Sequence, residues 1–344
     1  MTSSRRAFLK QTVGFSAALA LGPARRAAAA VASMTERHGP KAEAARHVLA
    51  IGDFGAKAGD LPRQRAVSRA MAAYLRRNEL KPDALLMLGD NFYGGLGGRG
   101  VRSRRWGWNV EDMYPADTFN CPMYAVLGNH DYSGEGHQAT VQAELAYAQL
   151  PSRPRWTLPH KWYRFDIFGD GDGKKDGDDP LATALVTDTN FVYGRSHWVS
   201  RDERKRQLAW LAGELAKPRV APWLFVLGHH PVYSDGHHGD SEPLIDDFDP
   251  LLRRHKVDLY LSGHDHDLQH LEFKGHPTSF VVSGAGGARA RPVTYRGRGR
   301  FGRAVYGFSH LELRRDRLSV RHVDANGVQL YGFTKSRGGR VAIL

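Results

Sequence analysis

Five short apolar runs of the sequence end at a glycine that is followed by a side chain able to bind a metal ion. These blocks are Gly52-Asp53, Gly89-Asp90, Gly128-Asn129-His130, Gly228-His229 and Gly263-His264-Asp265-His266. Asp and Asn also form turns, so one block alone would indicate only a loop after a strand. Five blocks that together supply oxygen and nitrogen donors favour a site for two metal ions.

The apolar runs before the blocks predict buried β-strands, because continuous runs of this length are typical of strands covered on both faces. They span residues 48–51, 84–88, 124–127, 224–227 and 259–262. Helical patterns over residues 62–78 and 201–217 alternate with them, which predicts an α/β layered domain. Residues 304–323 alternate like a hairpin and add a mixed part to the sheet. Ligands of such sheets bind where the carboxyl ends of the strands open into loops.

The composition limits the class of protein and the kinds of metal site that are possible. The 344 residues are 41% hydrophobic and 25% charged, as in an ordinary globular protein, and we find no internal repeat and no second core. The net charge is +13, but five basic residues lie in the acid-free first 32, so 13 − 5 leaves +8 without them. The single cysteine, Cys121, excludes an intramolecular disulfide and a thiolate metal cluster. We expect it to be a small buried residue near a strand start.

The N-terminus has the features of an export signal. Arg5-Arg6 precede Phe8-Leu9-Lys10, a short apolar stretch covers residues 13–21, and small residues end at Ala32. This pattern resembles a twin-arginine signal peptide, whereas the alternative is a basic amphipathic arm. The apolar stretch is too short to span a bilayer permanently. We therefore expect the twin-arginine translocase as a partner and a periplasmic or secreted bacterial protein.

The chain is accordingly divided into four parts. We expect a signal peptide over residues 1–32, a polar linker over 33–46, one catalytic domain over 47–335 and a C-terminal tail over 336–344.

The five blocks resemble those of the calcineurin-like metallophosphoesterases, and more narrowly of the purple acid phosphatases in their small tartrate-resistant form. The likeness continues through residues 207–211, 283–286 and 307–313, so that it covers residues 47–335. It implies a four-layer α/β/β/α sandwich with two mixed β-sheets. It also implies an acid phosphatase that hydrolyses phosphate monoesters.

One exchange of residues carries the narrower resemblance. Most metallophosphoesterases of this kind begin with Asp-x-His, whose His is a metal ligand, but here that position is Gly55. In purple acid phosphatases the missing ligand is a Tyr three residues after the second-block Asp, which is Tyr93 here. A phenolate is a hard anionic donor that suits trivalent iron. The alternative for Tyr93 is a loop aromatic that packs on the sheet.

The resemblance implies two ligand sets that share one carboxylate. The Fe(III) ligands would be Asp53, Asp90, Tyr93 and His266. The second ion, which would be Fe(II), Zn(II) or Mn(II), would be held by the bridging Asp90 together with Asn129, His229 and His264. Two such ions lower the pKa of bound water and supply a hydroxide that attacks phosphorus.

The leaving alkoxide needs a proton or a positive neighbour, and two histidines are candidate catalytic residues. His130 directly follows Asn129, and His238 lies in the loop 231–239, where it matches the second active-site His of the family. Either could bind phosphate or protonate the leaving group, and the adjacent His237 could replace His238. His230 and Asp265 are expected to orient ligands.

Two irregular segments, 168–180 and 286–302, are expected to be exposed loops. The first carries five Asp residues, which could bind Ca²⁺ or simply face solvent. The second is rich in Arg. The family's animal members also have a disulfide-forming cysteine pair that is absent here.

Two rival functions remain at this stage. A phosphodiesterase or nuclease of the same superfamily could use the arginines to follow a phosphate backbone, but the run lacks regularly interleaved aromatics, so no specific nucleic acid partner is expected. A non-catalytic binding protein would have lost ligands, whereas all seven positions are filled. We expect a monomer that acts on a phosphate ester.

Overall fold

The computed structural model describes residues 45–133, 138–152, 155–168, 179–195, 198–294 and 298–344. Residues 44–344 form one compact unit. The expected signal peptide and all but the last two residues of the expected linker lie outside the described residues, as does most of the Asp-rich segment with its candidate Ca²⁺ site.

Eight strands form a first sheet in which β1 to β4 run parallel and β12 to β15 form an antiparallel meander beside β1. Across the sheet the strands are β15 (Val341–Ile343), β14 (Gln329–Ser336), β13 (Arg317–Asp324), β12 (Gly307–Leu313), β1 (Arg46–Ile51), β2 (Ala84–Met87), β3 (Met123–Ala125) and β4 (Trp156–Thr157).

Seven strands form a second sheet, which is also mixed because β6, β7, β8 and β10 run parallel while β5, β9 and β11 run against their neighbours. Across it lie β11 (Gly299–Arg303), β9 (Leu268–Leu271), β10 (Ser279–Ser283), β8 (Leu259–Ser262), β7 (Trp223–Leu227), β6 (Pro180–Val186) and β5 (Tyr163–Phe168). All five strands predicted before the glycine-led blocks are present as β1, β2, β3, β7 and β8.

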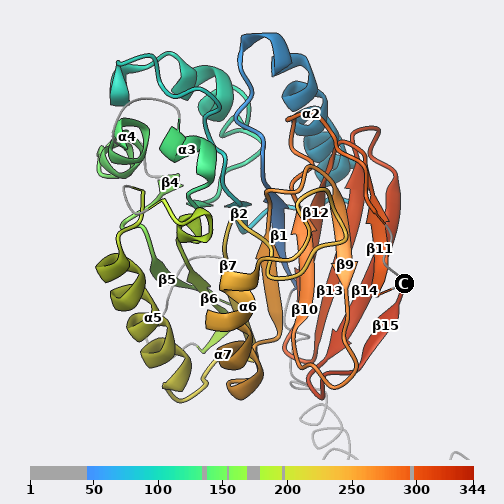
Figure 1. The fold of residues 1–344 in the computed structure, drawn as a ribbon. Helices are drawn as coiled ribbons and strands as arrows, with labels where there is room; N and C mark the ends of the chain where they lie inside the picture. The colour runs from blue at the N-terminus through green and yellow to red at the C-terminus, as the bar shows by residue number, and fades with distance from the viewer. Residues whose placement is uncertain (1–44, 134–137, 153–154, 169–178, 196–197, 295–297) are drawn as a thin grey trace, which may run out of the picture. The chain divides into compact units, whose positions relative to one another are not determined.

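Helices cover the outer faces of both sheets (Figure 1). They are α2 (Leu61–Arg77), α3 (Asn129–Ser133), α4 (Ala139–Ala148), α5 (Arg201–Ala216), α6 (Glu242–Asp247) and α7 (Asp249–Arg254). Single turns occur at η1 (Ala58–Asp60), η2 (Gly100–Arg102), η3 (Gly107–Glu111) and η4 (Asn190–Tyr193). The predicted helices 62–78 and 201–217 correspond to α2 and α5, and the predicted four-layer α/β/β/α sandwich is confirmed.

Local sequence explains where the two long helices begin. Pro62 lies in the first turn of α2, where a missing backbone N–H costs nothing. Ser200 and Glu203 form a capping box at the start of α5, because each side chain binds the backbone N–H of the other residue. Helix α2 buries Val67 and Met71 against the core, and α5 buries Leu211.

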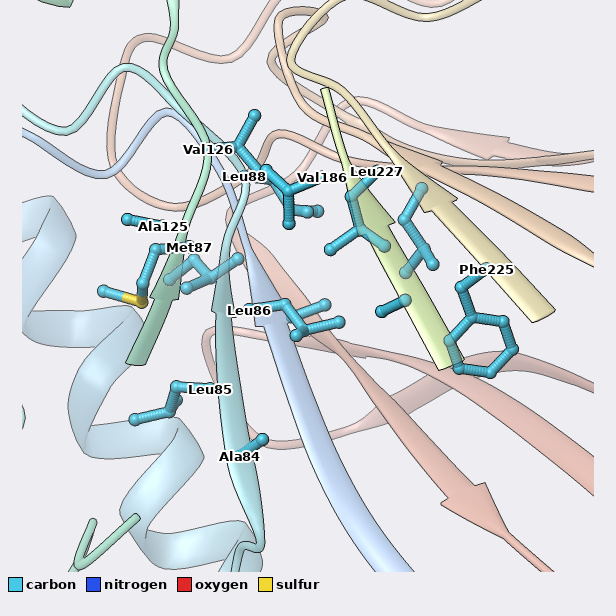
Figure 2. Close-up of a cluster of buried hydrophobic side chains, with 14 of the residues drawn as sticks. Ala84, Leu85, Leu86, Met87, Leu88, Ala125, Val126, Val186, Phe225 and Leu227 are labelled. Atoms are coloured by element: carbon cyan, nitrogen blue, oxygen red, sulfur yellow. The ribbon is translucent and has the colours of Figure 1, made fainter. Parts of the chain in front are cut away.

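The core between the sheets is made by alternate side chains of the parallel strands. In Figure 2, Leu86 of β2 points toward the second sheet, whereas Leu85 and Met87 lie on the side of the pale-blue helix α2. Val186 and Leu227 reach the same core from β6 and β7. All of these residues are fully buried or nearly so. The strands therefore end side by side, and their following loops meet at one edge.

Three predictions made from the sequence need correction. Arg46, placed in the linker, begins β1, and residues 341–343 of the expected tail form β15, which pairs with β14. The segment 286–302 is not wholly exposed, since residues 286–288 are buried against the end of β1 and β11 begins at Gly299.

Cys121 is buried two residues before β3, as expected.

Among the described residues, none of the helices combines the length and the apolar character that a membrane span requires.

Candidate metal centre

Three of the predicted ligands lie in turns with a left-handed backbone. Asp53, Asp90 and His264 have φ angles of 57°, 55° and 67°. Side-chain-bearing residues seldom adopt this conformation, although Asp and His are enriched in it, and such strain gathers at functional sites. Each residue follows a glycine just beyond β1, β2 or β8, so the chain turns sharply where the two sheets meet.

A first group of donors consists of Asp53, Tyr93 and His266. The Tyr93 hydroxyl donates to Asp53 Oδ1 at 3.1 Å and lies 3.1 Å from His266 Nε2. His266 Nε2 is in turn 3.4 Å from Asp53 Oδ1. Asp53 and His266 are both buried. Side chains from loops after β1, β2 and β8 thus converge.

A second group consists of Asn129, His229 and His264. His229 Nε2 lies 3.2 Å from Asn129 Oδ1, and the rings of His229 and His264 have centroids 5.1 Å apart. One nitrogen of His229, one of His264 and one of the neighbouring His230 lie within 4.8 Å of one another. All three histidines are buried.

Asp90 belongs to both groups. One of its oxygens lies within 4.8 Å of donor atoms of Asp53 and His266, and its Oδ1 is 3.4 Å from His229 Nε2. The backbone N–H of His130 donates to that Oδ1 at 2.8 Å, which fixes the carboxylate. The geometry is therefore that of a carboxylate placed between two neighbouring donor sets.

The second nitrogen of each histidine ligand candidate is held by an oxygen outside the cluster. His229 Nδ1 lies 2.8 Å from the carbonyl oxygen of Leu88, and His266 Nδ1 lies 2.8 Å from that of Arg289. His264 Nε2 lies 2.9 Å from the hydroxyl of Tyr193. Such contacts fix ring orientation and leave the opposite nitrogen for a metal ion. No local motif pointed to Tyr193 as a site residue.

The electrostatics of the cluster favour a cation. Burial alone would raise the pKa of Asp90, but the contact with His229 brings it well below its usual range. Burial alone would lower the pKa of His229, but Asp90 and then Asp53 raise it to about 10. Burial, followed by Asp53 and Asp90, raises the pKa of Tyr93 well above its ordinary value. The buried carboxylates of Asp53 and Asp90 are therefore stabilised by positive charge beside them, and the donor set fits metal ions.

A buried polar network supports the loops that carry Asp90 and Asn129. Asn91 Nδ2 donates to Glu144 Oε2 and to the Val126 carbonyl, both at 2.9 Å. Asp131 accepts from the backbone N–H groups of Phe92 and Gly128 at 2.9 and 2.8 Å. Burial raises the pKa of Asp131 to about 7 and that of Glu144 well above its usual range.

The exchange of His for Gly at position 55 has a structural reason. A Cβ atom at Gly55 would overlap the Asn91 carbonyl and lie 2.5 Å from Phe92 N. Gly55 N donates to the Asp90 carbonyl at 3.1 Å, and Tyr93 N donates to the Gly55 carbonyl at 2.9 Å. Because Gly55 has no side chain, the loop 90–93 packs directly on it and carries Tyr93 to the cluster.

The two predicted catalytic histidines both lie at the centre. The centroids of the His130 and Tyr93 rings lie 4.3 Å apart with the planes tilted by 38°, and the His238 ring stacks on that of His264 at 4.0 Å. His238 Nδ1 lies 2.7 Å from Asp265 Oδ1, so Asp265 orients this histidine. His237 contacts the ring of His238, whereas His238 itself contacts His264 and Asp265, so the geometry favours His238.

Arg291 is a site residue that sequence reasoning placed only in a run of arginines. Its Nη1 lies 2.7 Å from His238 Nε2. Guanidinium groups only donate hydrogen bonds, so His238 Nε2 accepts and Nδ1 carries the proton toward Asp265. The Arg-rich segment reaches the site because Ala288 N donates to the Asp53 carbonyl and Arg291 N to that of His266, at 2.9 and 3.3 Å. Arg291 thus places a cation beside His238.

Comparison with known proteins agrees with this geometry. Residues 46–268 match the model of the calcineurin-like phosphoesterase family. The chain is 32% identical over 306 residues to tartrate-resistant acid phosphatase type 5 of Sus scrofa, a match that covers 82% of this chain and 84% of that protein. The chain belongs to the purple acid phosphatases. Members of this group are metallophosphoesterases, and the chain is accordingly a hydrolase of phosphate esters.

Plant purple acid phosphatases are also similar. Purple acid phosphatase 7 of Arabidopsis thaliana is 30% identical over 258 residues, with 72% of this chain and 71% of that protein covered. The structure of the purple acid phosphatase PPD1 from yellow lupin seeds superposes with a TM-score of 0.63 at 18% identity, over 86% of this chain and 54% of that chain. At that identity the superposition supports the fold alone.

Gly55→Ala tests whether the bare backbone at position 55 positions Tyr93. We expect overpacking against Asn91 to destabilise the protein by about 1–3 kcal/mol and to lower its metal content, because the loop 90–93 must move. Denaturant unfolding and elemental analysis measure the two effects. Gly213→Ala is the matched control, since Gly213 lies exposed in α5 with open space around it. Equal stability and metal content in the two variants would contradict the packing argument.

Proposed function

We propose that the protein hydrolyses phosphate monoesters at a dinuclear centre that holds Fe(III) and a divalent ion. The Fe(III) ligands are Asp53, Asp90, Tyr93 and His266. The ligands of the divalent ion, which is Fe(II), Zn(II) or Mn(II), are Asp90, Asn129, His229 and His264. The observation that carries the proposal is the Asp90 carboxylate, which lies within reach of both donor sets.

The difference between the two donor sets supports unequal ions. The first set combines two carboxylates and a phenol with one imidazole, so it is strongly anionic when ionised. The second adds only a neutral amide and two imidazoles to the shared carboxylate. Hard anionic oxygen donors suit a trivalent ion, whereas imidazole and amide suit a divalent one.

The residues around the cluster are arranged to receive a phosphate group. Two metal ions bound here would activate water and neutralise charge on the phosphate oxygens. His130 lies over Tyr93 and Arg291 lies against His238, so both sides of the cluster carry groups that can donate to phosphate. Asp265 keeps His238 in the tautomer whose Nε2 faces Arg291. We therefore assign His130 and Arg291 to phosphate and leaving-group oxygens, and His238 to the positioning of Arg291.

A nuclease function finds less support in the arginines. Arg298 donates to Asp240 Oδ1 and Oδ2 at 2.5 and 2.6 Å and to Asp235 Oδ1 at 2.8 Å. These carboxylates therefore neutralise the charge of Arg298 within the fold. Arg298 also connects the start of β11 to the loop that carries His238. Arg291 is directed at a single histidine. A continuous track for a polyanionic backbone would need these charges to be free.

Tyr93→Phe tests the iron and its tyrosine ligand together. We expect the oxidised wild-type protein to be coloured through charge transfer from the Tyr93 phenolate to Fe(III), and we expect the variant to lose this band while it keeps its fold. The measurement is a visible spectrum together with iron analysis of the purified protein.

Tyr193→Phe is the matched control, because the Tyr193 hydroxyl contacts a ring nitrogen of His264 outside the cluster. Its band should persist. A colourless wild-type protein that contains iron would exclude tyrosinate ligation. A colourless protein that contains only zinc or manganese would exclude Fe(III) in the first site.

We also propose that the chain is exported in folded form through the twin-arginine pathway, on the basis of Arg5-Arg6 and the apolar stretch after them. Replacement of both arginines by lysine should retain the precursor in the cytoplasm, as immunoblots of cell fractions would show. Normal export of the double variant would contradict the assignment.

A further inference from the structure

A cavity of about 380 Å³ lies between helix α2 and the segment that begins with η3. None of the residues that line it is a candidate metal ligand or catalytic residue, so it is distinct from the candidate metal centre. Its size lies in the range of pockets that bind small molecules. The wall from α2 consists of residues spaced so that they share one face of the helix. They are Arg65, Ser68, Arg69, Ala72 and Arg76.

The α2 wall is basic and its charges are unpaired. Helix α2 contains five Arg and no Asp or Glu. Two of these arginines are bound to other groups of the protein, since Arg63 pairs with Asp60 and Arg77 donates to a backbone carbonyl. The three that line the cavity are exposed, and none of them has an ion pair or a side-chain hydrogen bond to a described residue. Positive charge is therefore free on this wall alone.

Arg65 and Arg69 stand one helical turn apart. Like charges at this spacing repel each other and destabilise a helix. The small side chains of Ser68 and Ala72 form a floor beside them, and Ser68 Oγ donates to the Met113 carbonyl, which joins this floor to the opposite wall. An anion bound over the floor removes the repulsion, and guanidinium groups are well suited to phosphate because they donate two parallel hydrogen bonds.

The opposite wall carries an exposed aromatic ring. Trp108 belongs to η3, a single π-helical turn, and it is 48% exposed. Its indole makes no ring contact and no hydrogen bond with a residue that the structure describes. Quaternary ammonium groups bind in cages of several aromatic rings, but the other aromatic residue of the lining, Phe119, is fully buried. A single free face favours a planar ring that stacks on it.

Two carboxylates lie on the same wall as Trp108. Asp112 and Asp117 are exposed, and neither forms an ion pair with the arginines across the cavity. They would repel a polyanion such as nucleic acid or polyphosphate. Carboxylates accept hydrogen bonds from hydroxyl groups, as they do from the ribose of bound nucleotides. The cavity thus offers phosphate donors on one wall, and a stacking face with hydroxyl acceptors on the other.

We propose that this cavity is a second, non-catalytic site that binds a nucleoside monophosphate. Arg65 and Arg69 hold the phosphate, and Arg76 adds positive charge further along the same wall. The base stacks on Trp108, and the two Asp residues accept hydrogen bonds from the ribose hydroxyls. The site shares no residue with the candidate metal centre, so the inference goes beyond the proposed phosphatase function and does not depend on it.

Arg69→Glu tests the phosphate side of the site. The probe is the phosphonate analogue of adenosine monophosphate in which a methylene group replaces the ester oxygen, so that it resists hydrolysis. Isothermal titration calorimetry of the purified protein with its resident metal ions gives the number of probe molecules bound per chain. We expect this number to fall by one in Arg69→Glu, whether or not the metal centre also binds the probe.

Arg206→Glu is the matched control, because it makes the same charge change at an exposed residue of α5 that does not line the cavity. It should bind as many probe molecules as wild type. The same number in wild type and in Arg69→Glu, or an equal loss in both variants, would overturn the proposal.

Trp108→Ala tests recognition of the base. We expect the Kd for the binding event that Arg69→Glu lacks to rise about tenfold, because base stacking on the indole is lost. The Kd of ribose 5-phosphonate, which has no base, should change less than about twofold at the same site. Equal affinities of the two probes in wild type, or equal losses on both in Trp108→Ala, would refute a nucleotide site. Since Trp108 is exposed, this variant keeps the core intact and decides alone if Arg69→Glu does not fold.

Discussion

The Asp90 carboxylate is the feature on which the rest of the site depends. It is buried, it follows a left-handed turn and it lies between two sets of donors. Its place requires Gly128, because a Cβ atom there would overlap the Asp90 backbone and carboxylate. The backbone N–H of His130, in the same loop, donates to it. The loops after β2 and β3 therefore form one unit, and the ends of both strands must lie side by side.

The same arrangement joins the two sheets. Gly52 N donates to the Ser283 carbonyl, and His264 N donates to Asp53 Oδ2, both at 2.7 Å. These bonds connect the end of β1 in the first sheet with the ends of β8 and β10 in the second. The two donor groups come from loops of both sheets, so the buried charge lies at the junction where the strand ends of both can reach it.

The sequence pattern predicted the five strands, because each apolar run ends at a glycine. The seven expected ligands came from the resemblance to the purple acid phosphatases. The sequence could not predict Tyr193, Glu144 or Arg291. These residues belong to segments without a local motif, and only tertiary packing brings them to His264, Asn91 and His238. The burial of residues 286–288 is equally a long-range effect, since their backbone pairs with residues more than 200 positions earlier.

Metal content of Asp90→Ala tests the shared carboxylate most directly. Purified wild type, Asp90→Ala and His229→Ala are dialysed against the same metal buffer and analysed by mass spectrometry for metal ions per chain. We expect two ions in wild type, about one in His229→Ala and close to none in Asp90→Ala, because only the last substitution removes a ligand of both ions. Retention of one or two ions by Asp90→Ala would contradict the account.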